Sequence, residues 1–385
     1  MNCPEQGNNF ELAMKQINEQ GFDGMGSAIQ ILINAAMKIE REQFLGVASY
    51  ERSDERSGYA NGFKPKMVKT RLGALDFKVP QVRDSSFYPS SLTKGLRSEQ
   101  ALRIAVAEMY FQGVSTRKVT AIMEQLCGLD MTSTQVSRAS AELDKEFTLW
   151  RTRDLGAYPY VFFDARYESI RHGGCVVDCA VLTAIGISPD HKREVLGVSI
   201  SLSEAEVHWR AFFSSLQSRG LKGIHLIISD DHAGLKAARK SVFPSIPWQR
   251  CHFHLQQNAQ KYVPKKDLKK KVASSIRSIF NAPNREEAES MLERTILEYQ
   301  KEAPGLSEWM GKNLAEGFTV FSFPEGHRKY LRTSNISERL NKEIKRRTRV
   351  ATIFPNEDSC LRLVTAIVME VSEEWISTKA YLPKE

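Results

Sequence analysis

Residues 158–202, with the sequence YPYVFFDARYESIRHGGCVVDCAVLTAIGISPDHKREVLGVSISL, decide the fold class. Short apolar segments bounded by Gly, Pro and Asp predict β-strands. This stretch has three such segments with turn residues between them, at 158–167, 175–188 and 193–202. We therefore expect a meander of three strands.

The residues that follow alternate between helix and strand. Ser203 and Glu206 have the spacing of a capping box, which predicts the start of a helix over 204–220. A buried strand ending in two acids (223–231), a helix (232–242) and a short strand (246–253) come next. The order β-β-β-α-β-α-β is that of an RNase H-like domain, whose mixed sheet places the first and fourth strands side by side.

The remaining segments extend this α/β domain in both directions. Residues 255–322 are lysine-rich at their start and predict an all-helical insertion, after which helices at 335–349 and 358–376 complete the domain. Upstream, residues 24–47 predict one long helix capped by Ser27, and residues 50–91 predict short strands and turns with a basic surface. The expected domains are 1–98 (N-terminal helix and basic strand/turn DNA-binding region), 99–150 (helix-turn-helix), 151–254 (first catalytic part), 255–322 (insertion) and 323–385 (second catalytic part).

Residues 99–148 return to helical spacing. Within them, VSTRKVTAIMEQLCG and MTSTQVSRASAELDKEF predict two short helices joined through Gly128, beginning at Ser115 and at Thr132 or Ser133. This is the outline of a helix-turn-helix, whose second helix enters the major groove, although an ordinary helical hairpin has the same pattern. The candidate DNA contacts are Arg117 and Lys118 on the first helix and Gln135, Ser137 and Arg138 on the second.

Composition is that of a globular protein with an anionic partner. The 385 residues are 42% apolar and 26% charged, with a net charge of +8 that favours binding to nucleic acid or a membrane surface. Six scattered cysteines do not form a disulfide scaffold, and no apolar run approaches the roughly 18 residues of a membrane span. We expect no membrane insertion and a cytoplasmic, nucleoid-associated protein.

Three acids are candidates for phosphodiester chemistry. Such chemistry at neutral pH is served by two divalent cations about 4 Å apart, and Mg²⁺ (or Mn²⁺) prefers carboxylate oxygens. Asp164 is expected to close the first strand and Asp230 the fourth, although a strand-end Asp often caps a turn. Glu338 lies in NISERLNKEIKRRTR (335–349), where it could instead cap the helix with Asn335 or pair with Lys342. The basic residues of this helix, which would follow DNA phosphates, are Arg339, Lys342, Lys345, Arg346 and Arg349.

Three further residues are candidate neighbours of the acids, and a fourth is a candidate for base stacking. Cys251 and His254 have zinc-ligand spacing, but a structural zinc site needs four ligands, so we expect a packing or hydrogen-bonding role instead. His232 follows Asp230 by two residues and is either an active-site neighbour or a plain helix-entry histidine. Trp309 in the insertion is a candidate for stacking on an unpaired base, although a core tryptophan is the commoner outcome.

The chain resembles the Mutator superfamily of DDE transposases from bacterial insertion sequences between about residues 40 and 370. The matching blocks include YERSDERSGYANGFKPK, MYFQGVSTRKV, FFDARYESIR, ISDDHAGL, WQRCHFH and RTSNISERLNKEIKRRTR. The resemblance implies that the catalytic triad is Asp164, Asp230 and Glu338, although Asp231 could replace Asp230, and that the family's Cys-x-x-His element is Cys251 and His254. The first thirty residues match nothing in this comparison.

The resemblance also implies a mechanism and partners. One strand is hydrolysed at each transposon end, and the exposed 3′-hydroxyl then attacks another phosphodiester with the help of the same two metal ions. The implied partners are the terminal inverted repeats and target DNA, bound by a homodimer or higher assembly. Two other functions fit the same residues: a non-catalytic DNA-binding protein descended from a transposase, and a stand-alone nuclease with an RNase H-like fold.

Overall fold

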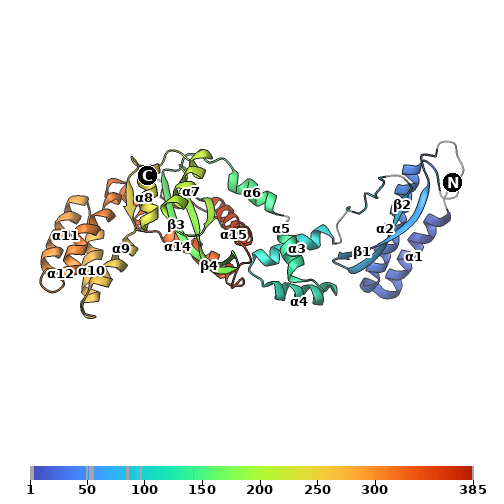
Figure 1. The fold of residues 1–385 in the computed structure, drawn as a ribbon, viewed down its shortest axis with the longest axis horizontal. Helices are drawn as coiled ribbons and strands as arrows, with labels where there is room; N and C mark the ends of the chain where they lie inside the picture. Colours follow the sequence, from blue (N-terminus) through green and yellow to red (C-terminus); the bar gives the residue numbers. More distant parts are fainter. Residues whose placement is uncertain are drawn as a thin grey trace. The chain divides into compact units, whose positions relative to one another are not determined.

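The structure is a computed structural model that describes residues 4–48, 51, 56–83, 86–92, 94, 98–141 and 143–383. It is a mixed α/β protein whose chain divides into two compact units, Met1–Glu142 and Leu143–Glu385 (Figure 1). In the described part of the chain, no helix is both long enough and apolar enough to cross a membrane.

The first unit consists of a helical pair, a β-hairpin and three short helices. Its elements are α1 (Pro4–Gln20), η1 (Gly21–Gly24), α2 (Met25–Leu45), β1 (Ala60–Thr70), β2 (Gly73–Val82), α3 (Gln100–Phe111), α4 (Thr116–Cys127) and α5 (Ser133–Ala141).

The helix α2 begins without the predicted Ser27 cap. The turn η1 continues directly from α1 into α2, so Gly24 precedes the first residue of α2 and no side chain caps the helix. Because the backbone is already helical at this point, Ser27 lies inside α2, and the prediction of a cap there was wrong.

The basic region forms one long hairpin instead of the predicted short strands. β1 and β2 pair antiparallel, with Val68 opposite Leu75. Alternate residues of the hairpin, including Val68, Leu75 and Phe77, pack against Met37 of α2. Because this packing continues along one face of the hairpin, both strands are stabilised over a greater length than predicted. The parts of region 50–91 at residues 50, 52–55 and 84–85 lie outside the described residues.

The helices α4 and α5 begin where the sequence predicts. The Ser115 hydroxyl caps α4, and Gly128 ends it in the left-handed conformation at φ 61°. At the start of α5, the Thr132 hydroxyl accepts the N–H of Gln135, and the Gln135 side chain accepts the N–H of Thr132. However, α5 ends at Ala141, shorter than the predicted segment that extends to residue 147.

The second unit contains the five-stranded sheet. Its elements are α6 (Asp144–Thr152), β3 (Tyr160–His172), β4 (Cys175–Ile187), β5 (Arg193–Ser201), α7 (Glu206–Ser218), β6 (Leu226–Ser229), α8 (Ala233–Val242), β7 (Trp248–Arg250), α9 (His252–Ala259), η2 (Gln260–Tyr262), α10 (Leu268–Phe280), α11 (Arg285–Tyr299), α12 (Pro304–Asn313), η3 (Leu314–Gly317), η4 (Thr319–Ser322), α13 (Glu325–Leu331), α14 (Asn335–Thr348) and α15 (Glu357–Ser377).

The order of strands in the sheet is β5-β4-β3-β6-β7. The pairs β5–β4 and β4–β3 are antiparallel, whereas β3–β6 and β6–β7 are parallel. The first and fourth strands of this unit, β3 and β6, are therefore neighbours, as expected from the sequence.

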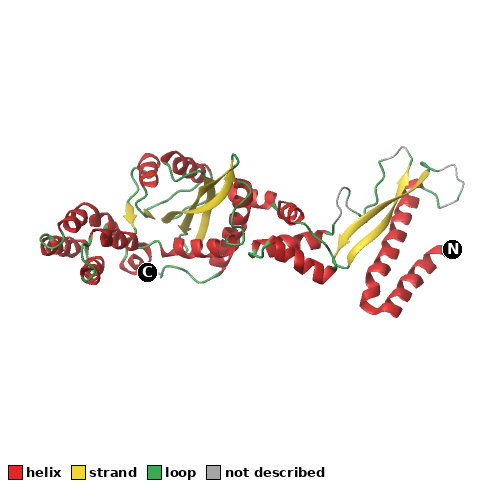
Figure 2. Ribbon diagram, turned by 60° about the horizontal axis from the view of Figure 1, so that its bottom comes forward, coloured by secondary structure: helices red, strands yellow, loops and turns green. Residues whose placement is uncertain are grey.

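Helices cover both faces of this sheet (Figure 2). Side chains alternate between faces along a strand, and Val161 and Phe163 of β3 contact the buried side chains of α7 and α8, such as Trp209 and Leu235. On the other side, α14 and α15 pack against β3, and α15 also packs against β5. The core of the unit is therefore a sheet between two helical layers.

Two local predictions in this unit were wrong. β3 does not end at Asp164 but continues to His172, because its antiparallel pairing with β4 persists beyond the point where its partner β6 stops. Ser203 and Glu206 form no capping box: Ala205 precedes α7, and the Ser203 hydroxyl accepts the Ala205 N–H instead.

The helical insertion begins earlier than residue 255. α9 starts at His252, and β7 is correspondingly short. No described residue between 255 and 322 is in a strand, and this segment has its own apolar core from α9 to η4, including Leu255, Val272 and Leu306.

Candidate active site

Parallel pairing places Asp164 and Asp230 at one edge of the sheet. Phe162 of β3 lies opposite Ile228 of β6, and each aspartate follows its residue of this pair by two positions. Because the two strands run in the same direction, both acids lie beyond the last paired residues at the same end. This is the arrangement expected of strand-end residues that serve one site.

The Asp164 carboxyl group is buried and is influenced by the charge of Asp230. Burial, and after it the negative charge of Asp230, raises the pKa of Asp164 to about 7. Within the described residues, the Asp164 carboxylate accepts two hydrogen bonds, from the Ala165 N–H (2.9 Å) and from the Asn341 side-chain amide (2.9 Å). The second of these comes from α14, which lies along β3.

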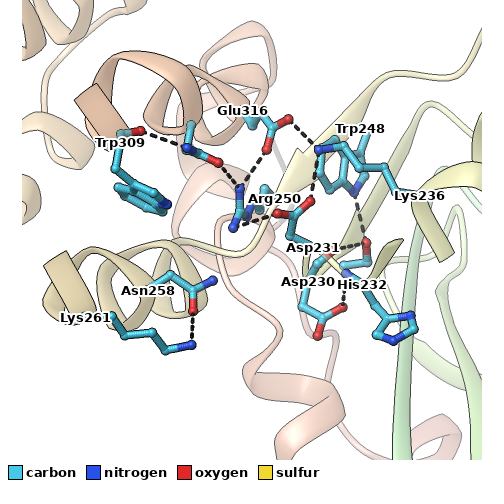
Figure 3. Close-up of polar contacts among 12 residues, drawn as sticks. Asp230, Asp231, His232, Lys236, Trp248, Arg250, Asn258, Lys261, Trp309 and Glu316 are labelled. Carbon is cyan, nitrogen blue, oxygen red and sulfur yellow. Dashed lines mark hydrogen bonds and ion pairs between the residues drawn. The ribbon is translucent and has the colours of Figure 1, made fainter. Parts of the chain in front are cut away.

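Asp230 and its neighbour Asp231 have different surroundings (Figure 3). Both Asp231 oxygens are in ion pairs, with Arg250 (2.9 Å) and with Lys236 (2.9 Å). Glu316 completes a ring of four charges, at 2.8 Å from Arg250 and 2.7 Å from Lys236. In the described part of the chain, the Asp230 carboxylate accepts one hydrogen bond, from the His232 N–H at 3.3 Å. The Asp230 carboxylate therefore retains lone pairs that are free to bind a ligand. The corresponding lone pairs of the Asp231 carboxylate are occupied by its two ion pairs.

Glu338 lies on the side of α14 that contacts Asp164. It precedes Asn341 by three residues, and residues three apart on a helix share a face. Arg166 of β3 also donates to the Asn341 carbonyl (2.7 Å). Within the described residues the Glu338 carboxylate has no hydrogen bond or ion pair, so it pairs with neither Asn335 nor Lys342. Over the same residues, no three His, Cys, Asp or Glu side chains are close enough together to hold a metal ion.

Cys251 and His254 join the insertion to the start of α14. The Cys251 thiol is buried and accepts hydrogen bonds from the Ser334 N–H and hydroxyl, each at 3.3 Å. The hydrogen bond between Cys251 and His254 raises the pKa of His254 to about 9. Burial of the imidazole acts in the opposite direction, and the negative charges of Asp230 and Asp164 raise the pKa further. The Ser334 carbonyl in turn accepts the N–H of Glu338 (3.0 Å). The contacts of Cys251 with Ser334 thus hold in place the first turn of α14, which contains Glu338.

Sequence reasoning missed two residues of this site. Asn341 was read only as part of a helix, and Glu204 was hidden by the wrong capping-box prediction. Burial raises the pKa of Glu204, and the negative charge of Asp230 raises it further. His232, whose ring nitrogen lies 3.5 Å from the Glu204 carboxylate, lowers this pKa. His232 itself lies beside Asp230 and Glu204. A search for acids just after a strand end would have found Glu204, three residues beyond β5.

Trp309 lies between the surface and the core of the insertion. It is half-buried, stacks on Tyr262 with ring centroids 5.7 Å apart, and lies 6.0 Å from the Arg250 guanidinium. It lines a cavity of about 610 Å³ together with Asn258 and Lys261 (Figure 3). The part of the ring that lines this cavity is therefore not enclosed by the core of the insertion.

The predicted DNA contacts are all exposed. One of them is already in an ion pair, since Arg346 lies 2.6 Å from Glu343. The exposed residues are Arg117 and Lys118 on α4, Gln135, Ser137 and Arg138 on α5, and Arg339, Lys342, Lys345, Arg346 and Arg349 on α14.

Comparison of the whole sequence with known proteins shows the family to which this chain belongs. The sequence model of the family described as "Transposase, Mutator family" matches residues 1–378. The chain belongs to the Mutator family of transposases. The match also covers the first thirty residues, which the motif comparison left unassigned.

Three transposases illustrate the likeness. The transposase for insertion sequence element IS406 from Burkholderia multivorans is 55% identical over 97% of both chains. The transposase for ISRM5 from Rhizobium meliloti is 38% identical over 98% of this chain and 95% of its own length. The transposase for IS256 in transposon Tn4001 from Staphylococcus aureus is 35% identical over 91% of each chain.

Proposed function

We propose that this transposase cleaves DNA at the terminal inverted repeats of a bacterial insertion sequence and joins the exposed 3′-hydroxyl to target DNA. The observation that carries the proposal is the parallel pairing of β3 with β6, which brings Asp164 and Asp230 together beneath the helix that bears Glu338. The strand order and the two helical layers support an RNase H-like catalytic unit.

The chemical type of the donor atoms suits a pair of hard divalent cations, although among the described residues the three carboxylates do not lie close enough together to hold one. Asp164, Asp230 and Glu338 offer carboxylate oxygens, which Mg²⁺ and Mn²⁺ prefer. Neither Asp230 nor Glu338 forms an ion pair within the described residues, although His254 lies near enough to Asp230 to interact with its charge. When bound, two such ions activate the attacking oxygen and neutralise the charge that develops on the phosphate and leaving group. Asp231 is unsuited to this role because Arg250 and Lys236 already neutralise it.

The protein's own groups orient this site. Asn341 holds one oxygen of Asp164, and the Cys251–Ser334 contact holds the start of α14. In the first step, the oxygen of water attacks phosphorus, the bond from phosphorus to the 3′-oxygen breaks, and that oxygen leaves as the 3′-hydroxyl. In the second step, the oxygen of this hydroxyl gives up its proton and attacks the phosphorus of a target phosphodiester, the bond from that phosphorus to the target 3′-oxygen breaks, and the target strand leaves with a 3′-hydroxyl. The basic residues of α14 bind the DNA backbone nearby.

Other parts of the chain recognise DNA. α4 and α5 act as a helix-turn-helix that reads the terminal repeats, with Gln135, Ser137 and Arg138 exposed on the second helix. Trp309, which lines the cavity of the insertion, stacks on an unpaired base near the cleaved strand. Because two transposon ends must be joined, the active form is a homodimer or a higher assembly on DNA.

The experiment is a plasmid assay with the inverted repeats that border the gene. Each substitution Asp164→Asn and Glu338→Gln should reduce Mg²⁺-dependent cleavage and strand transfer about 1000-fold, since metal-ion stabilisation is worth several kcal/mol. Binding to the repeats should be nearly unchanged. The matched control is Asp190→Asn, which removes an exposed carboxylate in the turn between β4 and β5. Strand transfer that survives in either active-site variant would refute the proposal.

A further inference from the structure

A cavity of about 1040 Å³ lies within the first unit, among β1, α3 and α5. Its lining is strongly cationic, and none of its described lining residues is Asp or Glu. The cations come from four parts of the chain: Lys64, Lys66 and Lys69 from β1, Lys94 from the segment after β2, Arg103 from α3 and Arg138 from α5. We call this cavity the basic groove.

Specific contacts fasten the hairpin to the helices around the basic groove. Lys69 donates its ammonium group to the Asp130 carbonyl and its own carbonyl accepts the Glu99 N–H (2.8 Å). Next to it, Arg71 forms an ion pair with Glu99 at 2.7 Å. The two sides of the groove are therefore held together by the strand end and the start of α3.

Several of these cations lack a compensating charge. Lys64, Lys94 and Arg138 are exposed, and none has an ion pair or hydrogen bond within the described part of the chain. Like charges gathered on a concave surface repel one another and concentrate the positive potential there. A bound polyanion would remove this repulsion.

The spacing of the cations indicates which polyanion fits. Lys64 and Lys69, which both line the groove, are five residues apart on β1, so their backbone positions are about 17 Å apart although their side chains leave opposite faces of the strand. The rise of duplex DNA is 3.4 Å per phosphate of one strand, so this span covers about five base pairs. A single phosphate group would need only one or two of these cations.

The groove also adjoins the helix that would read bases. Gln135 and Arg138, three residues apart on α5, both line it. We propose that the basic groove binds the sugar-phosphate backbone of double-stranded DNA, so that the hairpin and α5 grip the duplex together. This inference rests on the proposed function for its choice of DNA, and it adds the hairpin as a second contact beside the helix-turn-helix.

The test measures binding of the full chain to a duplex of arbitrary sequence at several salt concentrations. The variant Lys64→Ala/Lys94→Ala removes two exposed cations that have no partners among the described residues, so folding should be preserved. Each phosphate contact contributes about 0.9 to the slope of log affinity against log salt. The slope should therefore fall by about 1.8, and the affinity at 0.1 M salt by roughly 50-fold.

The control variant Lys38→Ala/Lys240→Ala removes the same charge from exposed positions on α2 and α8, outside the groove. An equal loss in both variants would show an effect of net charge alone and overturn the proposal, as would an unchanged slope in the groove variant. A second binding assay uses polyglutamate as a model of an acidic protein. If the groove variant loses binding to polyglutamate but keeps its binding to the DNA duplex, the groove is a protein-docking surface and the proposal is wrong.

The outcome is separable from that of the proposed function. This assay measures equilibrium binding to DNA that contains no terminal repeat, so it does not depend on cleavage. Failure of the wild-type chain to cleave the repeats would contradict the proposed function and leave the groove result standing.

Discussion

Asp230 and Asp231 are adjacent in sequence but differ in what surrounds their carboxylates. The Asp231 group lies in a ring with Arg250, Lys236 and Glu316, and the Arg250 side chain is only 2% exposed. A buried guanidinium that loses a partner retains the full cost of its desolvation. Asp231 therefore has a structural role, whereas Asp230 has its oxygens available for a ligand.

Substitutions at these two positions should separate stability from activity. Asp231→Asn should lower the free energy of unfolding by about 2 kcal/mol, because it removes the charge that balances Arg250. Asp230→Asn should leave stability unchanged or slightly higher, because it relieves repulsion with Asp164, and should abolish cleavage. Urea denaturation and the plasmid assay measure the two effects. The reverse pattern would contradict this assignment of roles.

At the level of elements, α14 connects the acids to the rest of the second unit. Its buried Arg347 lies 2.7 Å from Glu343 on the same helix and 2.8 Å from Glu370 on α15. Near its end, the Thr348 hydroxyl donates to Glu168 of β3. These contacts hold the helix between β3 and α15, and so fix the direction in which Glu338 projects.

The pH dependence of stability should reveal this anchoring. The hydrogen bond from Arg346, opposed by burial and assisted by Arg347, lowers the pKa of Glu343 to about 2. A carboxylate with a lowered folded-state pKa stabilises the protein above its unfolded pKa of about 4.5, and this stabilisation disappears as the pH falls towards 2.

The variant Glu343→Gln measures the contribution directly. Relative to the wild type, it should be less stable by about 1–2 kcal/mol at pH 7, a value reduced by solvent screening of a partly exposed group. The difference should vanish between about pH 4.5 and pH 2. Denaturant unfolding at a series of pH values provides the measurement, and a difference that is independent of pH would contradict the ion-pair explanation.

At the scale of the whole molecule, each of the two compact units has apolar cores of its own. In the first unit, Met37 packs with the hairpin and Val106 packs among α3–α5. In the second unit, the sheet and the insertion each enclose a separate cluster. Units with their own cores are expected to fold independently.

A chain that begins at residue 143 should therefore fold and retain the candidate active site. It should unfold cooperatively in urea, and it should lose selective binding to the terminal repeats, because α4, α5 and the basic groove are absent. Circular dichroism and a competition assay between repeat and scrambled duplexes measure these properties. Selective binding that persists in the shortened chain would contradict the proposal that the first unit recognises the terminal repeats while the second unit contains the active site.

The sequence by itself determined many of the helices and strands, because local apolar periodicity and caps specify them. The starts of α4 and α5 at Ser115 and Thr132, the range of α14 and the strand ending before Asp230 follow from residues only a few positions apart. The strand order was also accessible, since few connections are compatible with this order of elements.

Only the tertiary structure decided the details around the acids. β3 continues past Asp164 because β4 pairs with it there, and Asp231 is distinguished from Asp230 by Glu316 and Arg250, which are distant in sequence. Asn341 reaches Asp164 across 177 positions. Such contacts depend on how whole elements pack against one another, and the local pattern of residues contains no record of that packing.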